Sequence, residues 1–140
     1  MFKKVIGVLL VLFNFNLMAQ SPIGIWRNID ENDGIEKSHI EVYEENGKLY
    51  GKVIRLLPTA TVTHCDNCEG DQKGASILNM IILKDLVPVD NGWDGGLILD
   101  PGKGKEYLCK LTMHKKDILN VRGYIIKPLF GKTQKWYRLE

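Results

Sequence analysis

The chain has 140 residues, and its 19 basic and 17 acidic side chains give a formal charge of +2. This length fits a single domain with its own packed core, without structural metals or many disulfides. The near balance of charge and the lack of basic runs argue against a nucleic-acid-binding protein and against electrostatic attachment to anionic lipid.

The N-terminus is typical of a secretory signal peptide. Two lysines precede a short apolar run, Val5–Phe13, and the small residue Ala19 ends a candidate cleavage site. A bilayer span needs about 20 apolar residues, so an uncleaved anchor is the weaker alternative. We predict a signal peptide over residues 1–19 and a single β-barrel domain over residues 20–140. The mature protein would be periplasmic or extracellular, near neutral, and not inserted in a membrane.

Short segments with strand character follow one another through the rest of the chain. The clearest is a hairpin over residues 38–56, because its Asn46-Gly47 pair favours a type I′ turn between two alternating segments. The predicted strands cover residues 24–27, 38–44, 49–56, 80–83, 93–99, 105–113, 118–126 and 133–139.

Residues 57–76 show no hydrophobic period and form a predicted long loop, of a kind that is usually functional or cross-linked. The other connections are short turns rich in Asp, Asn and Gly. Eight or nine short strands in meander order predict an all-β fold, an antiparallel up-and-down closed barrel with little helix.

The first and last predicted strands resemble the calycin pattern of lipocalins and their relatives. In that pattern a Gly-x-Trp motif opens the first strand, here Gly24 to Trp26, and an arginine of a late strand packs over the Trp. Arg138 is the natural candidate for that arginine. A guanidinium over an indole gains about 0.5–2 kcal/mol of cation–π energy, so the pair would close one end of the barrel.

Nearly the whole mature chain resembles a bacterial family called domain of unknown function 2147. The resemblance implies an exported protein with a lipocalin-like barrel and no established activity. Asn79 and Lys132 depart from it, where Gly and Arg are expected. The matching stretches are residues 24–26, 47–52, 65–70, 93–101, 104–107, 121–124 and 129–138.

The three cysteines leave several pairings open. Cys65 and Cys68 form a CxxC motif in the long loop, and an oxidising compartment favours a local disulfide between them. A redox role lacks the helix N-terminus that stabilises a thiolate, and a zinc site with His64 would lack a fourth ligand. Cys109 shares a strand face with apolar residues, so we expect a buried thiol or a partner for a loop cysteine.

Polar and aromatic side chains alternate along the last two predicted strands. If they point inward, the barrel holds a cavity that suits an amphipathic or anionic small molecule, since guanidinium binds carboxylate and phosphate. The alternatives are a filled barrel in which they form a satisfied buried network, or a set of which part faces solvent. The candidate ligand-binding residues are Arg122, Tyr124, Gln134 and Trp136.

No catalytic constellation, metal site or cofactor motif stands out, so we expect a protein that is not an enzyme and holds no cofactor. Two functional hypotheses remain. The first is a barrel that binds a small molecule in its interior. The second is a filled barrel that acts in the cell envelope as a protein-interaction or stress-related module, through the loop that carries Cys65 and Cys68.

Overall fold

A computed structural model of the chain describes residue 7 and residues 21–140. The predicted signal peptide lies outside this part of the chain, apart from residue 7, so its assignment stays a prediction. None of the described residues belongs to a helix long and apolar enough to cross a bilayer.

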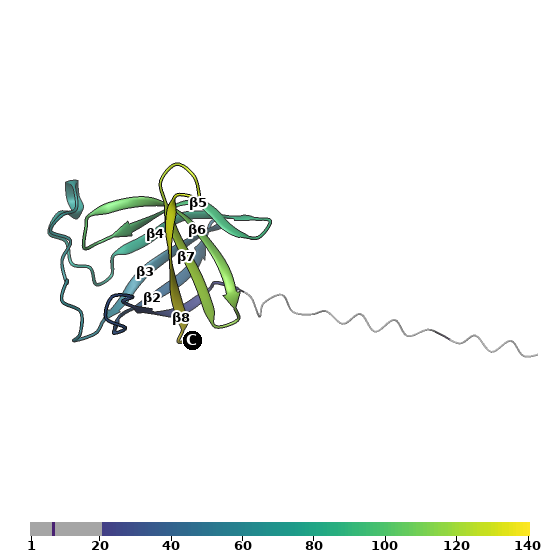
Figure 1. Cartoon of the computed structure of the whole chain (residues 1–140), viewed down its shortest axis with the longest axis horizontal. Coiled ribbons are helices and arrows are strands. Elements are labelled where there is room, and N and C mark those ends of the chain that lie inside the picture. The colour runs from purple at the N-terminus through teal and green to yellow at the C-terminus, as the bar shows by residue number, and fades with distance from the viewer. Residues whose placement is uncertain (1–6, 8–20) are drawn as a thin grey trace, which may run out of the picture.

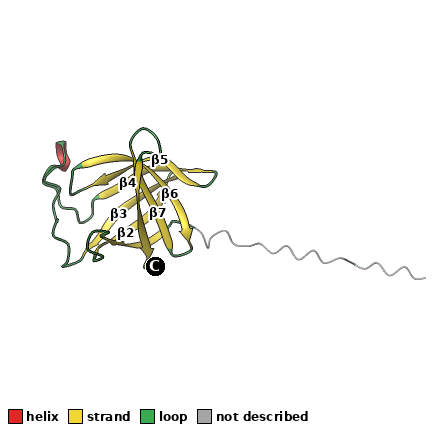
Figure 2. Ribbon diagram, viewed as in Figure 1, coloured by secondary structure: helices red, strands yellow, loops and turns green. Residues whose placement is uncertain are grey.

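The described residues form one closed antiparallel barrel in which each strand pairs with the next and β8 returns to β1 (Figures 1 and 2). The predicted fold class is therefore confirmed, with eight strands in this part of the chain. The strands are β1 (Gly24–Ile29), β2 (Glu36–Glu45), β3 (Lys48–Leu56), β4 (Ile81–Val89), β5 (Gly92–Asp100), β6 (Lys105–Lys115), β7 (Ile118–Tyr124) and β8 (Gly131–Arg138).

The predicted first hairpin is present, with β2 and β3 joined at Asn46 and Gly47. Their φ angles of 52° and 78° are both positive, as the type I′ turn requires. Side chains then alternate along both strands, which brings Ile40, Val42 and Val53 into the core.

β4 is longer than predicted, because the strand continues past the apolar run that ends at Leu83. The hydrophobic pattern of the strand is interrupted by Lys84, Asp85 and Pro88. Asp85 also adopts a φ of 60° within the strand. Pro88 is tolerated since the pairing of β3 with β4 ends at Leu86, so no donor is required there from its nitrogen.

The long connection between β3 and β4 folds against the barrel and contains a 3-10 turn, Gly70–Gln72. A disulfide joins Cys65 to Cys68, and both residues are buried. The segment packs on the β5–β6 turn, where Asn67 Nδ2 donates to the carbonyl of Gly102 at 3.0 Å. The disulfide thus pins the loop beside one end of the barrel.

The barrel interior is filled unevenly. Large buried side chains, among them Trp26, Leu111 and Trp136, occupy the part nearer the chain termini. Nearer the other end, one cross-strand row consists of small residues, since Cys109 pairs with Gly96 on one side and with Gly123 on the other. This difference leaves space inside one end of the barrel.

The two glycines of that row differ in what a methyl group would meet. A Cβ at Gly96 would lie 2.1 Å from the carbonyl oxygen of Lys84, whereas a Cβ at Gly123 would lie 3.5 Å from its nearest neighbours, in ordinary contact. We expect Gly96→Ala to lower the free energy of unfolding by about 2–3 kcal/mol, the cost of overpacking. Gly123→Ala should stay within about 1 kcal/mol of wild type. Urea denaturation of both variants measures this, and equal stabilities would contradict it.

Candidate functional site

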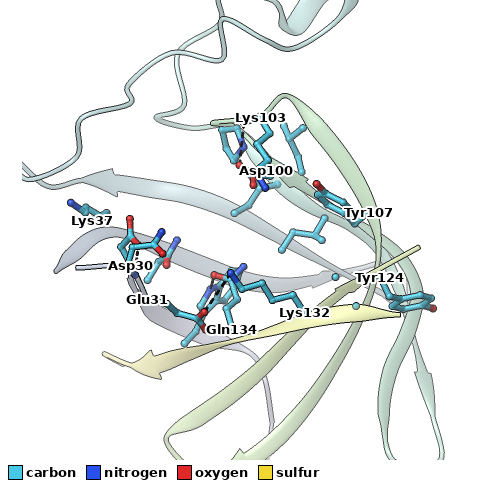
Figure 3. Close-up of a pocket in the computed structure, with 18 of the residues that line it drawn as sticks. Asp30, Glu31, Lys37, Asp100, Lys103, Tyr107, Tyr124, Lys132 and Gln134 are labelled. Carbon is cyan, nitrogen blue, oxygen red and sulfur yellow. Dashed lines mark hydrogen bonds and ion pairs between the residues drawn. The ribbon is translucent and has the colours of Figure 1, made fainter. Parts of the chain in front are cut away.

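A cavity of about 520 Å³ opens at the end of the barrel that lies away from the chain termini (Figure 3). Its walls combine the inner faces of the strands with the β1–β2 connection, the β5–β6 turn and the β7–β8 connection. Small-molecule sites in proteins typically occupy roughly 300–1,000 Å³. The space is therefore large enough for a small organic ligand.

The deeper part of the cavity is apolar. Trp136, only 1% exposed, contributes to the wall together with Ile82 and Ile98. Gly123 faces this space without a side chain, and Tyr107 lines it from β6. Apolar groups of a ligand would lose contact with water here, at about 25 cal/mol per Å² of buried surface.

The rim of the cavity carries both signs of charge, contributed by Asp30, Glu31, Asp100, Lys37, Lys103 and Lys132 (Figure 3). Several of these groups already have partners. Lys37 Nζ lies 2.8 Å from Asp33 Oδ2, and Asp100 Oδ1 accepts the backbone N–H groups of Gly102 and Lys103. The rim therefore offers a mixed polar surface and no concentrated positive field.

Arg122 does not lie with the other candidate ligand-binding residues. The pairing of β7 with β8 sets Val121 opposite Gln134 and Arg122 opposite Thr133, so Arg122 is on the outer face when Gln134 faces inward. Its guanidinium donates to the carbonyls of Pro128 and Leu129 and to Thr133 Oγ1. The expectation that all four candidates share one face is wrong, because alternation along a strand does not fix the register between strands.

The side chain of Tyr124 also lies on the outer face of β7, although Tyr124 is among the residues that border the cavity. Its ring points away from the other labelled residues in Figure 3, and its hydroxyl donates to Asp94 Oδ1 at 2.8 Å. Burial, and then this hydrogen bond to the carboxylate, raise the pKa of Tyr124 to about 12. The side chain ties β7 to β5 across the intervening strand.

Gln134 and Trp136 do line the cavity together. Trp136 Nε1 donates to Gln134 Oε1 at 3.2 Å, so the buried indole N–H is satisfied by its neighbour on the same strand face. Of the four candidates, these two side chains remain in a position to contact a ligand.

The rim residues were missed as a group, although the sequence contains a signal for them. In an up-and-down barrel, alternate connections gather at the same end. The connections after β1, β3, β5 and β7 therefore meet around one mouth, and their charged residues could have been collected as its rim.

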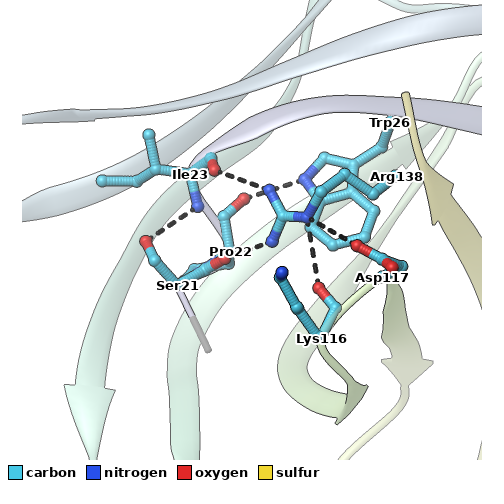
Figure 4. Close-up of polar contacts among 7 residues, drawn as sticks. All are labelled: Ser21, Pro22, Ile23, Trp26, Lys116, Asp117 and Arg138. Atoms are coloured by element: carbon cyan, nitrogen blue, oxygen red, sulfur yellow. Dashed lines mark hydrogen bonds and ion pairs between the residues drawn. The ribbon is translucent and has the colours of Figure 1, made fainter. Parts of the chain in front are cut away.

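Arg138 and Trp26 close the opposite end of the barrel (Figure 4). The guanidinium carbon lies 4.3 Å from the centre of the indole ring, and the two residues are paired across β1 and β8. Arg138 also donates to the carbonyls of Ser21, Ile23 and Lys116. The arginine thus joins the first strand, the last strand and the β6–β7 turn.

Cys109, the middle residue of the row of small residues, is a buried free thiol. Burial raises its pKa to about 12, and the carboxylate of Asp94 adds to this effect. The thiol is therefore protonated at neutral pH and a poor nucleophile. Across the residues that the structure describes, no three His, Cys, Asp or Glu side chains are grouped as metal ligands.

Removal of the Arg138 side chain should open the closed end. We expect Arg138→Ala to lower the free energy of unfolding by about 2–4 kcal/mol, because it removes the cation–π contact and leaves three carbonyls without their donor. The matched control is Arg55→Ala, which truncates an exposed arginine and should change stability by less than about 0.5 kcal/mol. Denaturant unfolding curves measure both, and similar losses would contradict the closing role.

Thiol titration should reveal the states of the three cysteines. At pH 8 the native protein should not react with Ellman's reagent, because burial keeps the Cys109 thiol neutral and out of reach. In guanidinium chloride one thiol per chain should react, and three should react after reduction. Rapid reaction of the native protein, or more than one thiol before reduction, would contradict this assignment.

Comparisons with known proteins agree with this architecture. The Helicobacter pylori protein HP1028, described as belonging to the lipocalin family, superposes with a TM-score of 0.75 at 22% identity, over 86% of this chain and 84% of that chain. This similarity shows a lipocalin-like fold. No curated protein sequence is significantly similar to the chain. The profile of the family described as "Uncharacterized protein conserved in bacteria (DUF2147)" matches residues 24–138, and the chain belongs to this family.

Proposed function

We propose that the protein binds a small amphipathic molecule in the cavity at the open end of its barrel and has a non-catalytic role. The observation that carries this proposal is the division of the cavity into an apolar interior and a polar rim. A ligand would place its apolar part against Trp136, Ile82 and Ile98. Its polar head would remain at the rim, in contact with water.

The charges of the rim refine the chemistry of the expected head group. Arg122 cannot contribute a guanidinium, since it is bonded to the β7–β8 connection on the outer face. Lys132 is exposed and lies 3.8 Å from Glu31, in a loose ion pair that a ligand could replace. We therefore favour a modest preference for an anionic head, set by Lys132 and Lys103, over a dedicated carboxylate or phosphate site.

We further propose that this binding takes place outside the cytoplasm. The Cys65–Cys68 disulfide supports an oxidising compartment, where such bonds form and persist. The candidate signal peptide, with its two lysines and the apolar run Val5–Phe13, points the same way.

Filling the cavity tests the proposal. We expect Gly123→Leu to weaken binding of 1-anilinonaphthalene-8-sulfonate at least about tenfold, because the new side chain occupies the space that the probe needs. The matched control Gly123→Ala adds one methyl group and should change the affinity less than about threefold. Fluorescence titration gives the affinities, and thermal unfolding verifies that both variants are folded.

Two outcomes would contradict the cavity as the binding site. The first is an unchanged probe affinity in a folded Gly123→Leu variant. The second is a wild-type protein that does not bind the probe at all. A loss of affinity in Lys132→Met of about threefold, with no change in Lys135→Met, would support the rim as the place of the anionic head.

A further inference from the structure

The connection between β7 and β8, residues 125–130, exposes four large apolar side chains within six residues. Ile125 is 61% exposed, Ile126 81%, Leu129 78% and Phe130 64%. Single exposed apolar residues are ordinary, whereas a contiguous group marks an interaction site. Ile125 and Phe130 also border the cavity, so the group lies at the mouth of the barrel.

The backbone at Ile126 gives a second and independent observation. Its φ of 69° lies in the left-handed region, which β-branched residues rarely occupy. Because the side chain is 81% exposed, no packing within the chain compensates for this conformation. A strained residue that contributes nothing to the core points to a functional role for its side chain.

The loop is held in one shape before it meets any partner. Ile125 N–H donates to the carbonyl of Phe130, and Phe130 N–H donates to that of Lys127. Arg122 adds donors to the carbonyls of Pro128 and Leu129. The apolar tip, which projects beyond the strands in Figure 1, is therefore presented by a small hydrogen-bonded frame.

Two exposed lysines flank this tip, although the chain as a whole is nearly neutral. Residues 125–132 contain two basic and no acidic side chains. Lys127 is in the loop itself and exposed, and Lys132 follows it at the start of β8. Lys132 Nζ lies 3.8 Å from Glu31 Oε2, in an exposed ion pair. The net charge of the chain does not reveal this local pair of lysines.

We propose that the β7–β8 loop docks the mouth of the barrel onto an anionic phospholipid bilayer. Ile126 and Leu129 would enter the boundary between head groups and acyl chains, and Lys127 and Lys132 would lie among the phosphates. Apolar groups flanked by lysines are the combination that binds such surfaces. The sequence-based argument against anionic lipid rests on the near balance of charge and the lack of basic runs, and the proposal departs from it for this hairpin.

The size of the loop favours lipid over a protein partner. A stable protein–protein interface buries about 800 Å² on each side and requires a complementary surface. A six-residue tip is small for that purpose, whereas a bilayer accepts a short apolar loop without a matching shape. This docking goes beyond the proposed cavity ligand and does not require that the cavity be occupied.

Vesicle flotation with the full mature protein tests the proposal. We expect binding to vesicles of equal parts phosphatidylcholine and phosphatidylglycerol at low salt, and weaker binding in about 0.5 M salt or with phosphatidylcholine alone. Ile126→Asn should reduce binding about fivefold or more while raising the melting temperature, since Asn tolerates the left-handed conformation. Leu129→Ser, which makes no change at the strained position, should also weaken binding.

Val89→Ser provides the matched control, because Val89 is 42% exposed beside the β4–β5 turn, away from the hairpin. It should leave flotation unchanged. Absence of wild-type binding to the anionic vesicles would overturn the proposal. Binding by the Ile126 and Leu129 variants equal to that of the wild type would also overturn it. Binding of 1-anilinonaphthalene-8-sulfonate by Ile126→Asn in the absence of vesicles reports separately on the cavity.

Discussion

The fold depends on the closure of β8 onto β1, secured by the stacking of Arg138 on Trp26. Three residue pairs join these two strands, fewer than join most other neighbours in the barrel. Without this seam the sheet would have two open edges, each with a row of unpaired backbone groups. The guanidinium reaches three carbonyls as well as the indole, so a single side chain holds the seam at its end.

Closure at one end allows space at the other. Because Trp26, Leu111 and Leu119 fill the interior toward the closed end, the barrel has a packed core that does not depend on the residues nearer the mouth. The row formed by Gly96, Cys109 and Gly123 can then consist of small residues without loss of the fold. The cavity exists because the same strands carry large side chains toward the closed end and small ones toward the mouth.

The sequence predicts the barrel well and the site less well, for a physical reason. Turn chemistry at Asn46-Gly47 and alternation within each strand are local, so strands and their order can be inferred. That Arg122 and Gln134 lie on opposite faces could not be inferred from alternation alone, since it depends on the register that the six-residue β7–β8 loop imposes. Matching apolar residues across the pair, Val121 and Leu119 with Trp136, would have indicated the observed faces.

The positions of the two chain ends have a practical consequence. Arg138 Nη2 lies 2.7 Å from the carbonyl oxygen of Ser21, and the N–H of Ile25 donates to the carbonyl of Glu140, so both ends of the described domain meet at the sealed base. A tag, fluorophore or surface tether fused there projects away from the mouth. The same proximity makes the barrel suited to circular permutation, in which a short linker joins the ends and a new opening is cut in an outer loop.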